Sequence, residues 1–405
     1  MGGATADSPL RRVADGTATD YWNDSCAAGE LAWAIERGAV GATSNPSLVL
    51  DALRQEPEPW RTRLRELAAA HPTAPEDDLA WLLAEAMGLR GAGMLAPEFA
   101  ASGGRRGRLS IQVDPSRYAD APAMIAQTSH FAGLAPNMQV KLPVTEAGLA
   151  AIEEATARGI NVNATVNFTV PGALAVAEAV ERGLDRLATA GGDPGAMTPV
   201  CTLMVGRLED WLRVVAARDG ILPTPGRVEW SGVAVAKRSI ALYRERGYRT
   251  RILVGAFRTH LPWTELAGLD IVLTIPPTWQ RLIDDAGLEA GDRGDLPVDA
   301  AILDELLARF PDFRRAYEPD GLAPAELARV RGHEPPVAEL RAHVAGAGHL
   351  VQHARIAAGV ARDVLDDAPR ARCVGHADHL AAPPALARRS GSGSMKSRTC
   401  ACRSW

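Results

Sequence analysis

One lysine in a strand-like stretch is the residue of this sequence best suited to covalent chemistry. The stretch NMQVKLPVTEAG (137–148) carries Lys141 among apolar residues, and the chain has three lysines, Lys141, Lys237 and Lys396, among 44 Lys and Arg residues. Burial lowers the pKa of a lysine, and a neutral amine can condense with a carbonyl as a Schiff base, which a guanidinium cannot do. Lys141 is therefore a candidate nucleophile. Pairing with a carboxylate, or a strand that faces water, is the alternative explanation.

Polar side chains recur at or near the predicted carboxyl ends of the strand-like segments. In a closed barrel these ends meet at one mouth, where barrel enzymes carry their chemistry. Capping explains any single one of these residues equally well, but the recurrence across all segments favours a shared site. The residues are Asp24, Asn45, Gln112, Lys141, Asn163, Thr165, Thr202, Arg207, Arg258 and Thr274.

Short apolar runs that alternate with longer helical patterns must position these side chains. Most of the runs carry β-branched residues, as strands do, and the second strand is followed by an expanded helical connection over 51–107. Eight strands alternating with helices predict a parallel sheet, with a closed (β/α)₈ TIM barrel as the leading architecture. An open doubly wound sheet is the alternative, but no G-x-G-x-x-G turn occurs. The predicted strands are 19–24, 40–45, 108–114, 138–144, 160–168, 199–206, 250–257 and 270–277.

The patterns divide the chain into four parts. We expect an N-terminal arm over 1–18 and the barrel over 19–295. Residues 296–368 show helical periodicity and predict a C-terminal helical segment attached to the barrel. Residues 369–405 have no periodicity and predict a disordered tail.

Composition excludes several classes of function. The net charge of −5 provides no basic field for nucleic acid, and no apolar run is expected to approach membrane-spanning length. The five cysteines are odd in number and irregularly spaced, which argues against a disulfide framework and for a reducing cytoplasm. We therefore expect a protein of the cytoplasm with no nucleic-acid or membrane partner.

A metal site has weak support. The stretch HLVQH places His349 and His353 on one helical face, at the spacing of a zinc pair, and Cys400 and Cys402 follow in the tail. The glutamate of an H-E-x-x-H motif is missing, and no third ligand is evident. We expect no metal.

Several stretches taken together resemble the transaldolase family. They cover roughly residues 20–285, in the order and spacing of that family. The resemblance implies a (β/α)₈ barrel that forms a Schiff base with a phosphorylated ketose and makes or breaks a carbon–carbon bond with no cofactor or metal. Related barrels often assemble as homo-oligomers, but the sequence fixes no stoichiometry. The stretches are NDSCAAGELAWAIERGAVGATSNPSLV, LSIQVDPSRYAD, MQVKLPVTEAGLAAIEEATARGINVNATVNFT, VGRLEDW and RILVGAFR.

The resemblance also implies roles for single residues. Lys141 matches the Schiff-base lysine, and Asp24 matches the aspartate that handles a substrate hydroxyl proton. Asn45 and Asn163 match asparagines that hold donor hydroxyls, and Thr165 matches the threonine that positions a catalytic water. Thr202 stands where the family has a serine on the sixth strand, and Arg207 and Arg258 match the phosphate-binding side, where guanidinium forks suit phosphate oxygens.

Four positions depart from the family pattern. Gln112 stands in place of the acid/base glutamate of typical transaldolases; the fructose-6-phosphate aldolases of the wider family share that glutamine but pair it with a tyrosine, where this chain has Met204. Ala256 replaces a serine of the phosphate site, and Asn167 is an additional polar group near the fifth strand end. A glutamine can orient water but has no carboxyl proton to exchange.

Three functions are therefore open. The first is a transaldolase that moves a three-carbon ketol unit between phosphorylated sugars. The second is a lyase that releases this unit, which Gln112 favours and Met204 does not. The third is a sugar-phosphate-binding barrel without activity, which the retention of Lys141 in a lysine-poor chain argues against.

Overall fold

A computed structural model describes residues 8–323 and 326 and shows a closed barrel of eight parallel strands in sequential order. Each strand pairs with its neighbours in the chain, and β1 pairs with β8 to close the sheet. All eight predicted strands are present within two residues of their expected bounds, so the predicted (β/α)₈ barrel is confirmed. The strands are β1 Asp20–Asn23, β2 Gly41–Thr43, β3 Arg108–Gln112, β4 Met138–Pro143, β5 Val162–Asn167, β6 Val200–Met204, β7 Arg251–Gly255 and β8 Val272–Ile275.

Helices separate the strands and cover the outside of the barrel, as a parallel sheet requires. Several begin at caps that the sequence supplies; at the beginning of the helix after β4, the Thr145 side chain accepts from the backbone N–H of Gly148 at 2.9 Å. The helices are α2 Pro9–Gly16, α3 Ala28–Glu36, α4 Pro46–Gln55, α5 Pro57–Ala70, α6 Glu76–Ala101, α7 Ala121–Ala132, α8 Glu146–Ala157, α9 Val170–Thr189, α10 Val205–Asp219, α11 Trp230–Arg246, α12 Leu261–Leu266, α13 Pro277–Asp285, α14 Ala300–Arg309 and α15 Pro311–Tyr317, with 3₁₀ turns at Pro115–Arg117 and Pro194–Ala196.

Alternation along β4 shows how the strands separate core from site. All six residues of β4 are buried, but Met138, Val140 and Leu142 belong to the large apolar cluster shared with the helices. Because side chains on a strand alternate between faces, Gln139 and Lys141 point to the barrel interior. Every residue of β4 is therefore buried, either against the helices outside the barrel or among the polar side chains inside it.

A separate small apolar cluster around Trp22 fills the barrel interior toward the amino ends of the strands. A Cβ at Gly41 would lie 2.5 Å from the Trp22 ring, so only glycine leaves room for the indole on the neighbouring strand. This packed layer closes the barrel beneath the polar groups and makes it a core rather than a pore.

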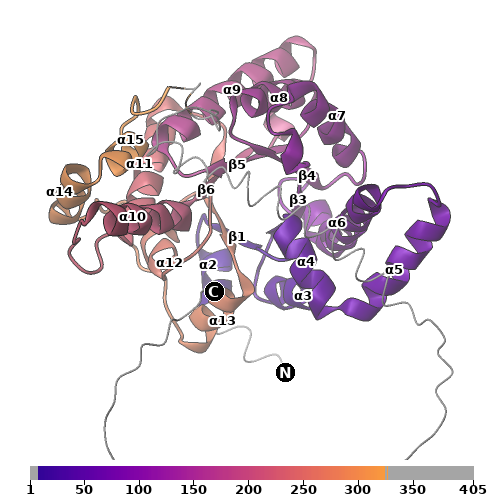
Figure 1. Cartoon of the computed structure of the whole chain (residues 1–405), viewed down its shortest axis with the longest axis horizontal. Coiled ribbons are helices and arrows are strands. Elements are labelled where there is room, and N and C mark those ends of the chain that lie inside the picture. The colour runs from indigo at the N-terminus through magenta and orange to yellow at the C-terminus, as the bar shows by residue number, and fades with distance from the viewer. Residues whose placement is uncertain (1–7, 324–325, 327–405) are drawn as a thin grey trace, which may run out of the picture. The chain divides into compact units, whose positions relative to one another are not determined.

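The connection between β2 and β3 is expanded into α4, α5 and α6, in agreement with the long segment that the sequence predicts. These helices share their own apolar cluster, which includes Trp60, Leu64 and Leu83. Helix α6 contacts α3, and α5 lies at the edge of the molecule (Figure 1). A Cβ at Gly91 would lie 2.4 Å from Leu109, so α6 approaches β3 closely at this glycine.

Helix α6 is long and apolar enough over Asp77–Ala101 to cross a membrane by length and composition alone. This corrects the expectation that no run approaches such a length. Its contacts with β3 and α5 account for the apolar face, and 39% of its most apolar window is buried in the described part of the chain.

Two helices follow the barrel at the start of the predicted C-terminal helical segment. Helices α14 and α15 lie beside α10 and α11 (Figure 1). The Trp211 indole N–H donates to Asp312 Oδ2 at 2.9 Å. The remainder of the predicted 296–368 segment, the predicted tail, the His349–His353 pair and Cys400 with Cys402 lie outside the described residues.

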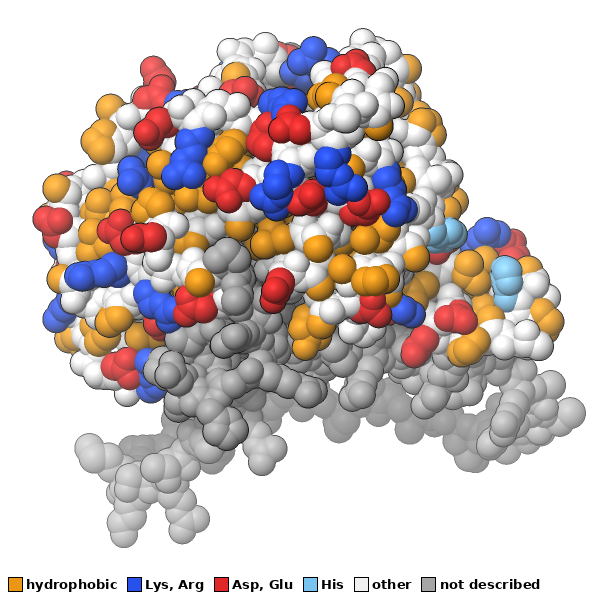
Figure 2. Space-filling model, turned by 90° about the horizontal axis from the view of Figure 1, so that it is seen from above, with side chains coloured by type: hydrophobic (Ala, Val, Ile, Leu, Met, Phe, Trp, Pro, Cys, Tyr) orange, Lys and Arg blue, Asp and Glu red, His pale blue; other side chains and the backbone are white. Residues whose placement is uncertain are grey.

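Acidic and basic side chains are interspersed on the face shown in Figure 2, and neither sign forms a broad field there. Among the described residues many surface charges pair, as Arg186 does with Glu153 and Glu154. This distribution fits the net charge of −5 and gives no surface suited to a polyanion on that face.

Candidate active site

Lys141 occupies the barrel interior with its neighbours on both adjacent strands. In the sheet register Gln112 of β3 lies beside Lys141, and Lys141 lies beside Asn163 of β5. The lysine is 8% exposed and its amine makes no hydrogen bond or ion pair with any described residue. Burial therefore lowers the pKa of Lys141, and the nearby Asp24 carboxyl offsets part of that shift.

Asp24 follows β1, and its carboxyl group raises the pKa of Lys141 against the effect of burial. Burial raises the pKa of Asp24, while Lys141 and a hydrogen bond from Thr43 oppose the rise. The Thr43 hydroxyl lies 2.6 Å from Asp24 Oδ1. The two opposite pKa shifts favour a neutral amine beside a carboxyl group that binds its proton more readily than usual.

A chain of two hydroxyl groups extends from Asp24 to β2 and β8, the two strands that flank β1. Thr43 Oγ1 lies 2.7 Å from Thr274 Oγ1 of β8, and both threonines are buried. A hydroxyl can donate or accept, so this chain can serve Asp24 in either protonation state by reversing its direction. The sequence predicted Thr274 at a strand end but did not predict Thr43. Thr43 lies on β2 two residues after Gly41, so alternation along the strand could have indicated that Thr43 points inward.

A second polar network lies beside Lys141. Asn163 is fully buried; its Nδ2 donates to Ser110 Oγ at 3.1 Å, and its Oδ1 accepts from Thr202 Oγ1 at 2.6 Å. Ser110 in turn donates to Gln139 Oε1 at 2.9 Å. Asn163 and Thr202 are thus brought together, and these hydrogen bonds hold the polar side chains next to Lys141 in place.

Gln112 and Thr165 lie at the same end of the barrel with no side-chain hydrogen bond to any described residue. They are 7% and 2% exposed, respectively. Val166, directly after Thr165, has a φ of 61°, an outlier for a β-branched residue, and the β5–β6 register shifts between Ala164 and Asn167. The positive φ of Val166 and the register shift therefore mark local backbone strain directly after Thr165.

The predicted phosphate side lies at the beginning of α10 and the end of β7. Arg258 Nη2 contacts Asp210 Oδ2 at 2.9 Å, and Arg207 approaches the same carboxylate at 3.7 Å. Both arginines are exposed, so phosphate oxygens can reach them. A Cβ at Gly206 would lie 2.1 Å from the carbonyl oxygen of Ala256, which is why only glycine allows these two turns to meet.

Two predicted polar residues are engaged locally. Asn45 caps α4, accepting from the Leu48 N–H at 3.0 Å, and is partly exposed, with its Nδ2 donor without a described partner. Asn167 Oδ1 accepts from the Thr169 N–H at 3.1 Å, so this side chain supports the beginning of α9. This local hydrogen bond explains why a polar residue stands at position 167 without a role in the site.

Cys26 is a neighbour of the site that the sequence did not single out. Burial raises the pKa of its thiol to about 12, with a further contribution from Asp24, and Lys141 opposes this shift. The protonated thiol is a weak nucleophile.

No group of three or more His, Cys, Asp or Glu side chains that could hold a metal ion occurs among residues 8–323 and 326. What the mouth offers instead is an amine, a carboxyl group, hydroxyls and amides, which suit carbonyl chemistry and proton transfer.

Comparison with known families agrees with this geometry. The family model described as transaldolase/fructose-6-phosphate aldolase matches residues 21–308. The chain belongs to this family. The match begins in β1 and ends in α14, so it includes the whole transaldolase-like barrel.

Actinobacterial transaldolases are among the relatives. Transaldolase 1 of Streptomyces avermitilis is 32% identical over 58% of this chain, and the alignment spans 64% of that relative, slightly less than two thirds of its length. Transaldolase 1 of Streptomyces coelicolor is 29% identical over 80% of this chain and 93% of its own length. The transaldolase of Mycobacterium ulcerans is 29% identical over 67% of this chain and 79% of its own.

Proposed function

We propose that this chain is a Schiff-base transaldolase that transfers a three-carbon ketol unit between phosphorylated sugars, with no metal or cofactor. The observation that carries the proposal is the Lys141 amine, 8% exposed inside the barrel, without a partner among the described residues and beside Asp24. Family membership supports the same class of chemistry.

In the first step the neutral Lys141 amine adds to the ketose carbonyl carbon. The carbinolamine then loses its hydroxyl as water and leaves a protonated iminium. A proton must be delivered to that hydroxyl, and Gln112 and Thr165 can hold a water in hydrogen-bond reach but have no acidic proton of their own. Asp24, whose pKa is raised by burial, is the nearby group able to supply one.

In the second step Asp24, now a carboxylate, removes the proton from the hydroxyl of the carbon beyond the bond to be broken. The carbon–carbon electron pair moves toward the iminium, the aldehyde leaves and an enamine stays on Lys141. Attack of the enamine on an acceptor aldehyde reverses these movements. Hydrolysis of the new iminium then returns the free amine and the product ketose.

Asp24 performs both proton transfers in this scheme, and the hydroxyl chain through Thr43 and Thr274 supports it. When Asp24 is a carboxylate, Thr43 donates to it and accepts from Thr274. When Asp24 is protonated, the acid donates to Thr43 and both hydroxyls turn. The chain thus offers a hydrogen bond to each form, which matters where the usual third-strand glutamate is Gln112.

A lyase that releases the ketol unit is the second candidate, and Gln112 is the observation that favours it. The two are separated by incubation with fructose 6-phosphate, with and without erythrose 4-phosphate, while free dihydroxyacetone is measured. A transaldolase forms product mainly when the acceptor is present. A lyase releases dihydroxyacetone without it, and binding without turnover would support a sugar-phosphate-binding barrel.

A further inference from the structure

Asp210 lies between the two arginines of the predicted phosphate side. It belongs to α10, three residues after Arg207, and reaches Arg258, which follows β7. Its carboxylate accepts from Arg258 Nε at 3.1 and 3.2 Å and from Nη2 at 2.9 Å. Arg207 Nη1 lies 3.7 Å from the same carboxylate, which is beyond hydrogen-bond distance. Asp210 therefore holds Arg258 by hydrogen bonds and acts on Arg207 only through its charge.

The Arg258 side chain is fixed along its whole length. A Cβ at Gly206 would lie 2.6 Å from Arg258 Cγ, so the aliphatic stem lies directly over this glycine. Arg258 Nη1 donates to the Phe257 carbonyl at 3.1 Å. A guanidinium has five N–H groups, and the carboxylate and the carbonyl occupy three of them. One N–H of Nη1 and one of Nη2 therefore stay free of any described partner, on a side chain that is 36% exposed.

Arg207 has the complementary properties. It makes no hydrogen bond within residues 8–323 and 326, and its side chain is 44% exposed. Partial burial and the charge of Arg258 lower the pKa of Arg207, and Asp210 opposes this effect. The two guanidinium groups are therefore close enough to repel each other, and Asp210 offsets that repulsion. Ala256 supplies no side-chain donor beside them, so the position of each guanidinium matters more.

We propose that Asp210 is a positioning residue that orients Arg258 for the phosphate group of the sugar substrate. The inference rests on the proposed function, which makes a sugar phosphate the ligand of these arginines. An arginine that is held before binding loses less side-chain entropy when the phosphate arrives. The two free N–H groups of Arg258 then meet phosphate oxygens without a change of rotamer, and Arg207, which has no described hydrogen bond to break, adds its own N–H groups.

The negative charge of Asp210 also opposes phosphate binding, so its two effects have opposite signs. The Asp210 and Arg258 side chains are 27% and 36% exposed, and solvent and salt weaken the repulsion between a carboxylate and a phosphate at such a position. Two-point pairing of a guanidinium with a carboxylate, in contrast, has a defined geometry that single surface ion pairs lack. The loss of orientation should therefore outweigh the gain in charge when Asp210 is neutralised.

Asp210→Asn keeps the size of the side chain and removes the carboxylate. We expect the KM for fructose 6-phosphate to rise about tenfold, the loss typical of a hydrogen bond to a charged group, with kcat little changed. The kcat/KM for fructose, which has no phosphate, should stay at the wild-type value, a difference that a general loss of structure would not produce. Asp210→Glu keeps the charge and should show a smaller rise in KM.

Binding to Lys141→Met tests the same inference without turnover. Calorimetry of this variant with fructose 6-phosphate should show an affinity that falls about tenfold when Asp210→Asn is added and also falls when Arg258→Met is added. With both additions the two losses should not add, because Asp210 acts through Arg258. If these results hold while the wild type shows no turnover, the proposed function fails and the role of Asp210 stands.

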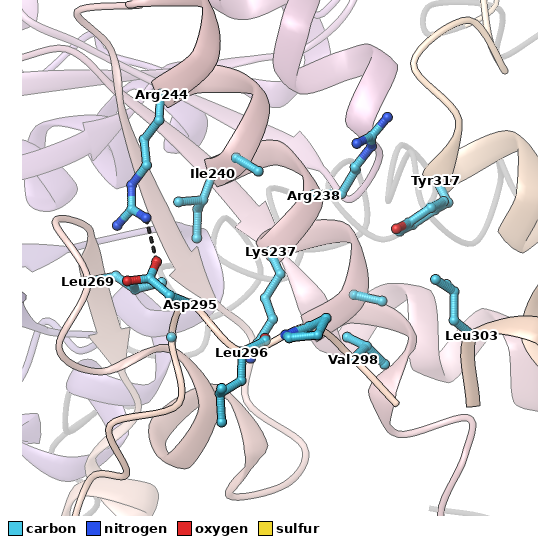
Figure 3. Close-up of a pocket in the computed structure, with 14 residues that line it drawn as sticks. Lys237, Arg238, Ile240, Arg244, Leu269, Asp295, Leu296, Val298, Leu303 and Tyr317 are labelled. Carbon is cyan, nitrogen blue, oxygen red and sulfur yellow. Dashed lines mark hydrogen bonds and ion pairs between the residues drawn. The ribbon is translucent and has the colours of Figure 1, made fainter. Parts of the chain in front are cut away.

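Two other arginine–aspartate pairs are matched controls because they lie away from the mouth of the barrel. Asp219, the last residue of α10, accepts from Arg218 Nε at 2.7 Å and from Nη2 at 2.8 Å, which is the same two-point geometry. Asp295 accepts from Arg244 at 2.6 Å at a pocket beside α11 that Leu269, just before β8, also lines (Figure 3). Asp219→Asn and Asp295→Asn should bind and convert fructose 6-phosphate as the wild type does.

The proposal is overturned if Asp210→Asn binds fructose 6-phosphate as tightly as its parent or more tightly, if fructose turnover falls by the same factor, or if the losses from Asp210→Asn and Arg258→Met add in full. It is also overturned if Lys141→Met fails to bind fructose 6-phosphate at millimolar concentration, or if Arg258→Met has no effect on this binding. Circular dichroism shows whether each variant is folded. If Asp210→Asn is not, Asp210→Glu decides, since it should weaken fructose 6-phosphate binding and spare fructose turnover.

Discussion

Two lysines of this chain are buried to a similar extent and have opposite surroundings. Lys141 is 8% exposed inside the barrel and has no hydrogen-bond partner among the described residues. The Lys237 side chain, on α11 outside the barrel, is 10% exposed and donates to a carboxylate and two carbonyls. Burial alone therefore does not make a lysine reactive. The absence of compensating acceptors does, because the amine then gains by losing its proton.

Lys237 lies on α11, and the segment that contains Arg293 and Leu296 folds back over it and supplies its acceptors. The lysine joins this segment to α11 and α12, and Glu265 of α12 also accepts from Arg293 at 3.2 Å. Lys237 is thus a structural residue.

The largest effect should come from Lys141→Met, which removes the proposed nucleophile. We expect turnover of fructose 6-phosphate to disappear, and Lys141→Arg to be equally inactive because a guanidinium stays protonated. Activity assays with a ketose donor and an aldose acceptor measure this. Retained turnover in the arginine variant would contradict the proposal.

Lys141→Met should also stabilise the fold. The folded-state pKa of Lys141 is lowered, so the unfolded chain binds its proton more tightly and wild-type stability rises with pH up to the ordinary lysine pKa. A pKa that is lower by one in the folded state costs about 1.4 kcal/mol of stability at neutral pH. Urea unfolding should show Lys141→Met to be more stable than the wild type, with a larger gap at pH 6 than at pH 9. An equal gap at both pH values would mean that the amine is charged when folded.

Asp24→Asn should have the second largest effect, because it removes the acid/base group next to Lys141. We expect kcat to fall about 10²- to 10⁴-fold, the usual range for general acid–base catalysis. The amine should still form its ketose adduct slowly, so borohydride labelling of this variant should persist. A variant that keeps most of its turnover would exclude Asp24 as the proton carrier.

Lys237→Met tests whether Lys237, the second buried lysine, has a structural role. The substitution leaves Glu265 buried with Arg293 as its one charged partner among the described residues, so we expect a loss of about 2 kcal/mol in unfolding free energy. Activity per folded molecule should be unchanged, since Lys237 takes no part in the reaction. The double substitution Lys237→Met with Glu265→Gln should recover part of the stability; if the single variant is as stable as the wild type, the interpretation of Lys237 as structural is wrong.

Thr43→Val should give the smallest effect and sharpens the account of Asp24. Removing the hydroxyl breaks the chain between Asp24 and Thr274, and we expect kcat to fall about tenfold, the loss typical of one hydrogen bond to a charged group. The pKa of Asp24 should rise further, since Thr43 lowers it, so the acidic limb of the pH–rate profile should move to higher pH. Thr43→Ser keeps the hydroxyl and should restore both values. A uniform loss with no movement of the profile would indicate a purely structural role for Thr43.

The fold was predictable because its signals are local. Each strand is short, β-branched and followed by a helical pattern, and the inward position of Lys141 follows from alternation along β4. Features that depend on distant segments were not predictable. The Thr43–Thr274 contact joins two strands that are far apart in the sequence, and the burial of Lys237 depends on a loop more than fifty residues away. Asn167 could be placed near a strand end, but its bond to Thr169 depends on the bulge in β5.

Reductive trapping tests the central claim most directly. The chain is incubated with fructose 6-phosphate and sodium borohydride, digested, and the modified peptide is mapped by mass spectrometry. The account predicts one stable adduct, carried by the peptide that contains Lys141, which is lost in Lys141→Met and retained in Lys237→Met. Labelling of Lys237 or Lys396 in place of Lys141, or no adduct under conditions where turnover is measured, would contradict it.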